Sequence, residues 1–171
     1  MIADVAHAVL AWMQQHEAWA PAVVFALAFG ESLAVISLLL PATVILLGAG
    51  GLIGAAGLSF WPVWTAAVAG AVLGDAVSYW VAYHFQDAVG RIWPLSRHPD
   101  LLPRGHAFFQ RWGTASVFLG RFFGPLRSVV PLVAGLCGMP HLMFQFANVT
   151  SALAWATLIL APGVFGARWL L

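Results

Sequence analysis

The chain has 171 residues, of which 62% are hydrophobic and only 8% are charged, and its mean hydropathy is +0.91. Soluble domains carry about 25% charged residues, so the composition excludes a water-soluble enzyme. Seven arginines against six acidic residues give a net charge of +1, too small for the basic surface that binds nucleic acid. We therefore expect an integral membrane protein.

Residues 1–17 predict a helix that lies on the membrane surface. Apolar residues recur there every three or four positions with polar residues between them, as in an amphipathic interfacial helix. No basic residue precedes the apolar core and no small-residue cleavage site follows it, so we do not expect a removable signal peptide. A short soluble helix that binds a partner is the alternative.

Residues 22–58 predict a broken membrane segment, because Pro41 and five glycines interrupt an apolar run. Broken backbone in hydrocarbon finds no water to bond, so the break must be buried in protein or face a wet cavity. We interpret this region as two half-helices, re-entrant in the membrane. Residues 60–85 then predict a full span that carries one charge, Asp75.

The second half of the chain predicts the same order. We expect residues 86–112 to form an aqueous loop, since residues 87–111 hold six of the thirteen charges. Within this loop a second amphipathic surface helix is indicated by Leu101, Leu102, Phe108 and Phe109. Residues 116–138 form a second broken segment, with Gly124, Pro125 and Pro131, and residues 141–166 form a last span. The stretch between residues 84 and 112 contains four arginines and two aspartates, so the positive-inside rule places this loop in the cytoplasm.

Short matches support an internal repeat within a single membrane domain. Gly30-Glu31 and Gly120-Arg121 each precede a proline, Pro41 or Pro131, by ten positions counted from the charged residue. We predict repeat units of about 1–86 and 98–171. Each unit has one re-entrant segment, which returns to the side it entered from, and one span. A unit therefore crosses the membrane an odd number of times, and the second unit must be inverted relative to the first. The predicted fold is an all-α integral membrane protein with an inverted repeat of re-entrant segments and spanning helices. In transporters built in this way, the substrate site lies at the interface between the repeats.

Four charges lie within the apolar segments, namely Glu31, Asp75, Arg121 and Arg127. Each costs about 2.5 to 3.5 kcal/mol on insertion scales. They either pair and hold the bundle together or mark a substrate or proton path. Two arginines on a broken segment suit a phosphate group. Carboxylates in a low-dielectric setting favour the protonated form and can exchange protons.

Cysteine and histidine carry no further chemistry in this sequence. Cys137 is the single cysteine, so it cannot form an internal disulfide. The six histidines have no second ligand at a trusted metal-site spacing. We therefore expect neither a metal nor a cofactor.

The chain resembles the DedA family of small membrane proteins over about residues 25–166. The Arg-Phe-x-x-Pro-x-x-Arg element from Arg121 to Arg127 is the most specific part of the resemblance. Its other parts are Glu31, Pro41-Ala42-Thr43, Gly74-Asp75 with Tyr79, Pro131, Ala134-Gly135, Asn148 and Trp155.

The resemblance implies two facing re-entrant segments in a multi-pass protein of the bacterial inner membrane. It implies movement of polyprenyl phosphates or phospholipids across the bilayer, as in bacterial undecaprenyl phosphate flippases. It also implies coupling to protons, with an essential acid near Glu31 and two essential arginines. The family commonly has an acid where this chain has Thr43, so coupling would depend on Glu31 with Asp75, and an uncoupled phospholipid scramblase is the alternative.

The expected site follows from these observations. Arg121 and Arg127 are expected to bind the phosphate of a lipid, and Glu31 and Asp75 to exchange protons. The expected partners are lipid phosphate, membrane lipids and protons, without nucleic acid, and self-association into a homo-oligomer is left open. The backbone breaks expected to line the site are Pro41, Thr43, Gly124, Pro125 and Pro131.

Other functional classes fit the sequence less well. An enzyme that cleaves lipid phosphates would need a histidine and an acid near the arginine pair, and no histidine lies between His106 and His141. A tether would need a larger aqueous surface. Proton-coupled export of a cation or drug is the serious alternative, because a membrane acid also suits a cation, although two arginines would repel one.

Overall fold

The computed structural model describes residues 8–9, 11–13, 15–33, 45–51, 59–85, 107–109, 111–123 and 127–170, with side chains as far as residue 162. Within these ranges the regular elements are all helical. Pro41, Thr43, Gly124, Pro125 and most of the predicted loop 86–112 lie outside the described residues. The named elements are the 3-10 helix η1 (Glu17–Trp19), α2 (Ala20–Ser32), α4 (Phe60–His84), α7 (Thr114–Gly120), α8 (Val129–Leu136) and α9 (His141–Leu170).

The two predicted spans are the long helices α4 and α9. Two stretches, Phe60–His84 and His141–Pro162, are long and apolar enough to cross a membrane. With a rise of 1.5 Å per residue, α4 is about 37 Å long, more than the roughly 30 Å of a bilayer core. The chain is thus an all-α protein with two candidate spans among its described residues.

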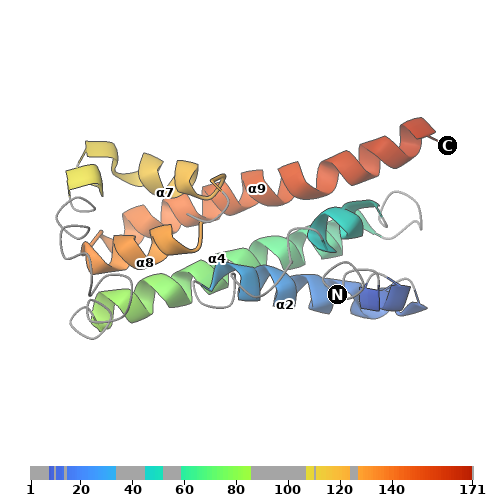
Figure 1. Cartoon of the computed structure of the whole chain (residues 1–171), viewed down its shortest axis with the longest axis horizontal. Coiled ribbons are helices and arrows are strands. Elements are labelled where there is room, and N and C mark those ends of the chain that lie inside the picture. The colour runs from blue at the N-terminus through green and yellow to red at the C-terminus, as the bar shows by residue number, and fades with distance from the viewer. Residues whose placement is uncertain are drawn as a thin grey trace.

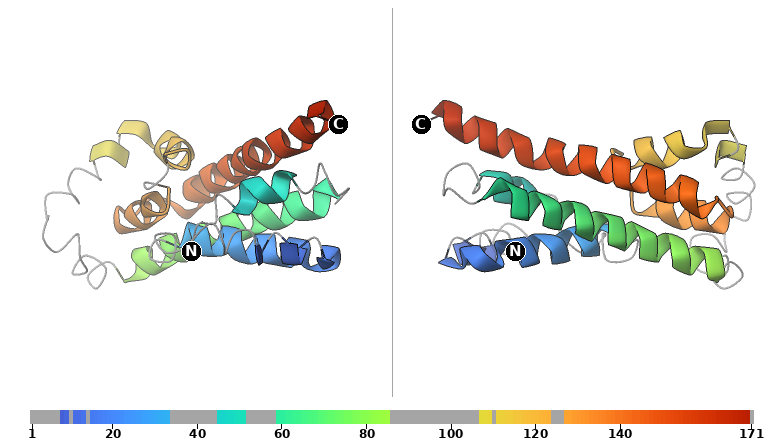
Figure 2. Two further views of the ribbon diagram at one scale, coloured as in Figure 1. Left: turned by 45° about the vertical axis from the view of Figure 1, so that its right-hand side comes forward. Right: turned by 180° about the vertical axis from the view of Figure 1, so that it is seen from behind.

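Helices α4 and α9 lie antiparallel along the molecule (Figures 1 and 2). Near the start of α4, Trp64 donates a hydrogen bond of 3.0 Å from Nε1 to Thr157 Oγ1, late in α9. Near the end of α4, the ring of Tyr79 stacks on Phe144, early in α9, with centroids 4.1 Å apart. The two helices therefore form the frame on which the shorter segments pack.

The short helices occupy opposite ends of this frame. Helix α2 and segment 45–51 lie where α4 begins, whereas α7 and α8 lie where α4 ends (Figure 1). Each half of the described chain runs through two short helical segments to a long helix. This order is the predicted one; the re-entrant geometry in a bilayer, the inverted repeat and its boundaries stay predictions.

Glycines let the short helices approach α4 closely. A Cβ at Gly74 would lie 2.6 Å from the carbonyl oxygen of Phe29 on α2, and one at Gly135 on α8 would lie 2.3 Å from that of Tyr79. Real Cβ atoms do not come so close to backbone. Small residues at such contacts are the usual means by which helices associate in membranes.

Helix α8 shows how a proline and a glycine set its two ends. Pro131 is the third residue of α8, in the first turn, where a missing N–H costs no helical hydrogen bond. The structure thus corrects the expectation that Pro131 breaks the segment, because the break precedes it. At the other end Gly138 has φ +65°. Met139 N donates to Ala134 O at 3.1 Å and Gly138 N to Gly135 O at 3.0 Å, a Schellman motif that turns the chain into α9.

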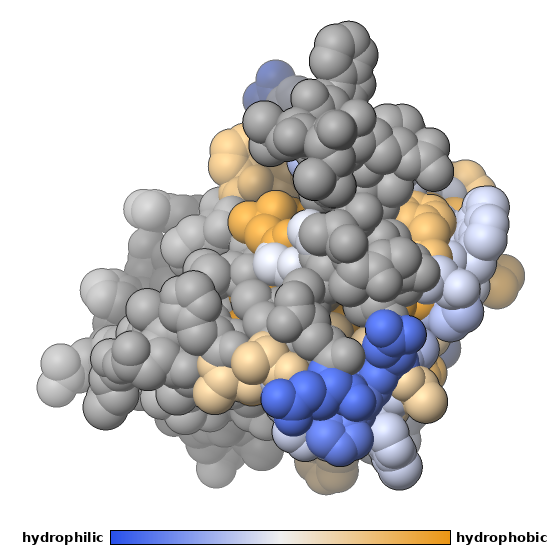
Figure 3. All heavy atoms as spheres, turned by 90° about the vertical axis from the view of Figure 1, so that its right-hand side faces the viewer, coloured by the Kyte–Doolittle hydropathy of each residue, from blue (hydrophilic) through white to orange (hydrophobic). Residues whose placement is uncertain are grey.

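Apolar clusters lie towards both ends of the bundle, and the two larger ones are the following. The first includes Val24, Leu46, Ala67 and Leu160, and the second includes Tyr79, Val117, Ala134 and Phe144. Large apolar side chains also cover the outside: Trp61 is 69% exposed and Leu142 is 86% exposed, which suits a surface in contact with lipid. Seen from the end where α2 and α4 begin, the nearest hydrophilic atoms form a patch with apolar atoms beside it, and another hydrophilic group lies further back at the upper edge (Figure 3).

Candidate functional site

Glu31 lies in the last turn of α2 and is buried. Its Oε1 atom is 2.7 Å from Nη2 of Arg127, in the segment between α7 and α8. The end of α2 is held against α4, since Ser78 Oγ donates to the carbonyl oxygen of Ser32 at 3.3 Å. The close approach of α2 to α4 therefore fixes where the Glu31 carboxylate sits.

Asp75 lies on α4 directly after Gly74 and forms a buried ion pair with Arg121. Arg121 is the residue that follows α7. Its Nη2 atom donates both to Asp75 Oδ2 and, at 2.8 Å, to Oδ1 of Asn148 on α9. The guanidinium group of Arg121 thus joins α4 to α9.

The break between α7 and α8 brings both arginines to one place. Six positions apart on a regular helix, they would lie on well-separated faces. Here α7 ends, and turn hydrogen bonds satisfy backbone N–H groups in the break: Phe123 N donates to Gly120 O and Arg127 N to Phe123 O, both at 3.2 Å. Backbone satisfied in this way is tolerated inside a membrane protein.

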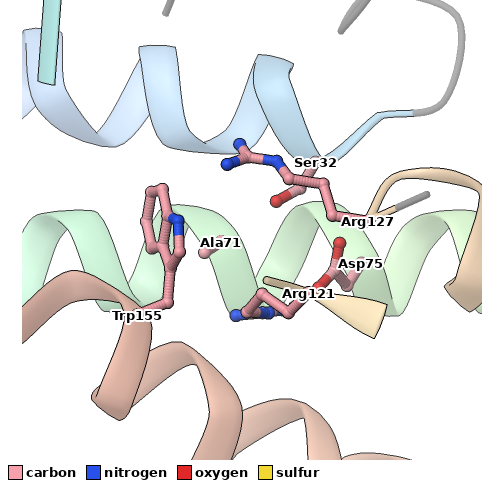
Figure 4. A pocket seen from close by; sticks show the side chains of 6 residues that line it. All are labelled: Ser32, Ala71, Asp75, Arg121, Arg127 and Trp155. Atoms are coloured by element: carbon pink, nitrogen blue, oxygen red, sulfur yellow. The ribbon is translucent and has the colours of Figure 1, made fainter. Parts of the chain in front are cut away.

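A small cavity lies between the two ion pairs. Its volume is about 10 Å³, and Figure 4 shows the side chains around it, with Ser32 on α2, Ala71 and Asp75 on α4, Trp155 on α9, and Arg121 and Arg127. This volume holds about one water molecule and no phosphate group. The structure is therefore a closed form of the site.

Arg121 keeps capacity for a further hydrogen bond, and Arg127 has an aromatic neighbour beside its carboxylate partner. Nη1 of Arg121 is buried and has no hydrogen-bond partner among the described residues. The guanidinium carbon of Arg127 lies 4.9 Å from the ring centroid of Trp155, a cation–π contact. Buried, partly satisfied guanidinium groups at one cavity can bind an anion once the cavity widens.

The site has no net formal charge as long as both pairs are ionised, since two carboxylates face two guanidinium groups. Both pairs join the first half of the chain to the second. Pairing inside the bundle, one of the two expectations for these four charges, is therefore present in this form. It leaves their transport roles as predictions, because a charge that is paired in a closed site can still exchange partners.

Four residues of the site stand outside the predicted set: Ser32, Ala71, Asn148 and Trp155. Of these, Asn148 and Trp155 contact the arginines. Asn148 is completely buried and Trp155 is 5% exposed. An asparagine inside an apolar span is a signal that sequence analysis can use. Tryptophan gives no such signal, because it is enriched at membrane interfaces. Among the described residues, no group of three histidines, cysteines or acids could hold a metal ion.

Comparison with known proteins places this chain in a family. Residues 40–165 match the VTT domain. The inner membrane protein YabI of Escherichia coli is 36% identical over 137 residues, which cover 80% of this chain and 54% of YabI. The uncharacterized membrane protein BU139 of Buchnera aphidicola is 32% identical over 142 residues, 83% of this chain and 56% of the relative. The uncharacterized membrane protein Rv2637 of Mycobacterium tuberculosis is 37% identical over 113 residues, 61% and 52% respectively.

The chain spans about half the length of these curated relatives. No solved structure matches it significantly. The domain match covers well over half of the chain, and its residues include Asp75, Arg121 and Arg127. The chain therefore belongs to the VTT-domain family, the DedA family of membrane proteins.

Proposed function

We propose that this protein carries a lipid phosphate across the bacterial cytoplasmic membrane and that protons accompany the lipid. Arg121 and Arg127 bind the phosphate group, and Glu31 and Asp75 exchange the protons. One observation carries the proposal: both guanidinium groups reach a single buried cavity, and each is held there by a carboxylate.

Charge explains why phosphate and protons would move together. With both pairs ionised the four charged groups sum to zero, so a phosphate that entered alone would leave a buried negative charge. Such a charge is costly in a low-dielectric interior. A proton on Glu31 or Asp75 cancels one negative charge and at the same time releases the arginine that the carboxylate was holding. The phosphate takes the place of the carboxylate.

The closed cavity defines what must move. A site of about 10 Å³ admits no phosphate, so the arginines must separate from the carboxylates before substrate binds. Glu31 and Asp75 belong to α2 and α4, which the contact at Gly74 holds together. Arg121 and Arg127 belong to the second half of the chain. Relative motion of two halves around a fixed site is the usual mechanism of such transporters.

The apolar exterior favours a lipid as the carrier of the phosphate. A substrate with long tails can reach the site from the bilayer while its tails stay in hydrocarbon. Undecaprenyl phosphate and phospholipids, which the family resemblance implies, both meet this requirement. The shared chemistry is a phosphate group on an apolar chain.

Reconstitution into sealed vesicles tests the proposal. Fluorescent analogues of a polyprenyl phosphate and of phosphatidic acid are placed in one leaflet, and their transfer is followed with and without an imposed pH gradient. We expect protein-dependent transfer that accelerates when the loading side is acidic. Lipid transfer at the same rate with and without the pH gradient would indicate an uncoupled scramblase. Dissipation of the gradient by simple cations without lipid transfer would indicate an exporter, and release of inorganic phosphate would indicate an enzyme.

A further inference from the structure

Asn148 occupies a central position that the four charges do not explain. It is completely buried, on the early part of α9. Its Oδ1 atom accepts a hydrogen bond of 2.8 Å from Arg121 Nη2. Its Nδ2 atom donates to the carbonyl oxygen of Val72 on α4 at 3.0 Å and to Gln145 Oε1 at 3.4 Å.

These partners fix the direction of the amide. The carbonyl oxygen of Val72 can only accept a hydrogen bond, and the guanidinium group of Arg121 can only donate one. The NH₂ group of Asn148 must therefore face α4 and its oxygen must face Arg121. A flipped amide would set donor against donor and acceptor against acceptor. Asn148 is thus an acceptor whose position the frame of the bundle determines.

A neutral acceptor does what a carboxylate cannot. Asp75 holds Arg121 and also cancels its charge, whereas Asn148 holds it and leaves the charge in place for an anion. Arg127 likewise has one charged and one neutral partner: the Glu31 carboxylate cancels its charge, and the Trp155 ring contacts it without cancelling the charge. Asn148 and Trp155 are seven residues apart on α9, about two turns, and so share one face of that helix.

We propose that Asn148 is a positioning residue that keeps Arg121 at the cavity when Asp75 is protonated and no longer holds it. This inference rests on the proposed function. In the closed form Arg121 has both acceptors. In the form that binds phosphate, Asn148 still holds Nη2 of Arg121, and Nη1, which has no partner among the described residues, donates to the phosphate.

Asn148→Asp is the decisive substitution because its two protonation states act in opposite ways. The ionised aspartate gives Arg121 a second carboxylate, which cancels its charge and opposes an anion. The protonated aspartic acid has one O–H donor for Val72 and one carbonyl acceptor for Arg121, the pattern of asparagine. Asn148→Leu keeps the branched shape in a somewhat larger side chain and removes all three hydrogen bonds at every pH.

The experiment measures KM and kcat for fluorescent polyprenyl phosphate in vesicles, each as a ratio to wild type at the same pH. For Asn148→Asp we expect KM to rise about tenfold at neutral pH, in line with one charge-assisted hydrogen bond, and to return towards wild type in acid. Asn148→Leu should have a raised KM throughout. Gln15→Glu makes the same change from amide to acid at an exposed position and should match wild type.

The outcomes separate this inference from the proposed function. An active wild type together with a normal KM for Asn148→Asp at neutral pH would overturn the role of Asn148 alone. A raised KM that acid does not restore would also overturn it, because the substitution would then act through the fold. A wild type that neither binds nor moves the lipid phosphate would overturn both proposals. If Asn148→Leu fails to fold, the acid recovery of a single Asn148→Asp preparation still decides the question.

Discussion

Nη2 of Arg127 lies 2.7 Å from Oε1 of Glu31, so an ion pair ties the end of α2 to the segment between α7 and α8. The two side chains are 12% and 7% exposed. Coulomb attraction is strong in such a setting, but so is the cost of leaving either charge alone. The closed form of the site therefore depends on both members of this pair.

Glu31→Gln keeps the shape of the side chain and removes its exchangeable proton. In the wild-type protein, binding of lipid phosphate should increase as pH falls, because a proton on Glu31 frees Arg127. In the variant, this part of the pH dependence should disappear, and transport should slow because no carboxylate returns to displace the phosphate. Binding and transfer of fluorescent polyprenyl phosphate across a pH series measure both effects.

Glu17→Gln is the matched control for this prediction, since Glu17 is exposed and outside the site. It should leave the pH profile unchanged. A wild-type profile in Glu31→Gln would leave Glu31 with a packing role only.

Asp75 and Arg121 should show strong coupling in unfolding experiments. Removing one partner of a buried ion pair costs about 3–5 kcal/mol, because the other charge stays buried without compensation, whereas replacing both by apolar residues costs far less. Asp75→Leu and Arg121→Met should each lower the free energy of unfolding in mixed detergent, and the double variant should be more stable than either. Additive losses would mean that the two residues do not interact in the membrane.

The contact between α2 and α4 predicts a contrast between two glycines. A Cβ at Gly74 would lie 2.6 Å from Phe29 O and from Ser32 Cβ, whereas a Cβ at Gly51 meets nothing within 4 Å. Gly74→Ala should cost about 1–3 kcal/mol through overpacking. It should also impair transport, since it pushes apart the segments that carry Glu31 and Asp75.

Gly51→Ala should leave transport unchanged and leave the unfolding free energy equal or slightly higher, because alanine restricts the unfolded chain more than glycine does. Unfolding and transport measured on the same preparations test the pair. Equal behaviour of the two variants would contradict the close packing at Gly74.

Hydropathy and rare charges allow much of this architecture to be predicted. The predicted spans 60–85 and 141–166 start at the same residues as α4 and α9, because a proline marks each start: Pro62 lies in the first turn of α4 and Pro140 directly precedes α9. The second break was expected between residues 116 and 138, and it lies between α7 and α8. The position of Pro131 was predicted wrongly, because we expected it to break the segment. It lies in the first turn of α8, where a proline is compatible with the start of a helix.

The pairing within the site could not be predicted in the same way. The sequence shows two acids and two arginines, but which acid meets which arginine depends on how far α2 reaches along α4 and where α7 stops. The neutral partners entered the sequence analysis only as parts of the family resemblance and were not predicted as site residues. Asn148 could have been predicted from its place inside an apolar span. Trp155 could not, because it acts through a contact between segments that neither hydropathy nor spacing reports.

The arginine-rich loop predicts an orientation that can be measured. Four arginines against two aspartates between residues 84 and 112 favour the cytoplasmic side. In a Cys137→Ser background, a cysteine introduced by Ser96→Cys should resist a membrane-impermeant thiol reagent added to intact cells and react after the membrane is opened. Ready reaction in intact cells would reverse the orientation.

Substitution of lysine for each site arginine distinguishes a phosphate site from a simple pair of charges. Lysine keeps the positive charge but lacks the planar fork of donors that contacts a carboxylate and a phosphate at once. Arg121→Lys and Arg127→Lys should therefore each raise KM for polyprenyl phosphate about tenfold or more. Arg111→Lys, at an exposed position, should be silent. Arg121 should be the more sensitive of the two. Its Nη2 atom already donates to both Asp75 and Asn148. An ammonium group cannot donate to both and still reach the phosphate from the same direction. Normal transport by both site variants would show that charge alone suffices and would refute a site built on guanidinium geometry.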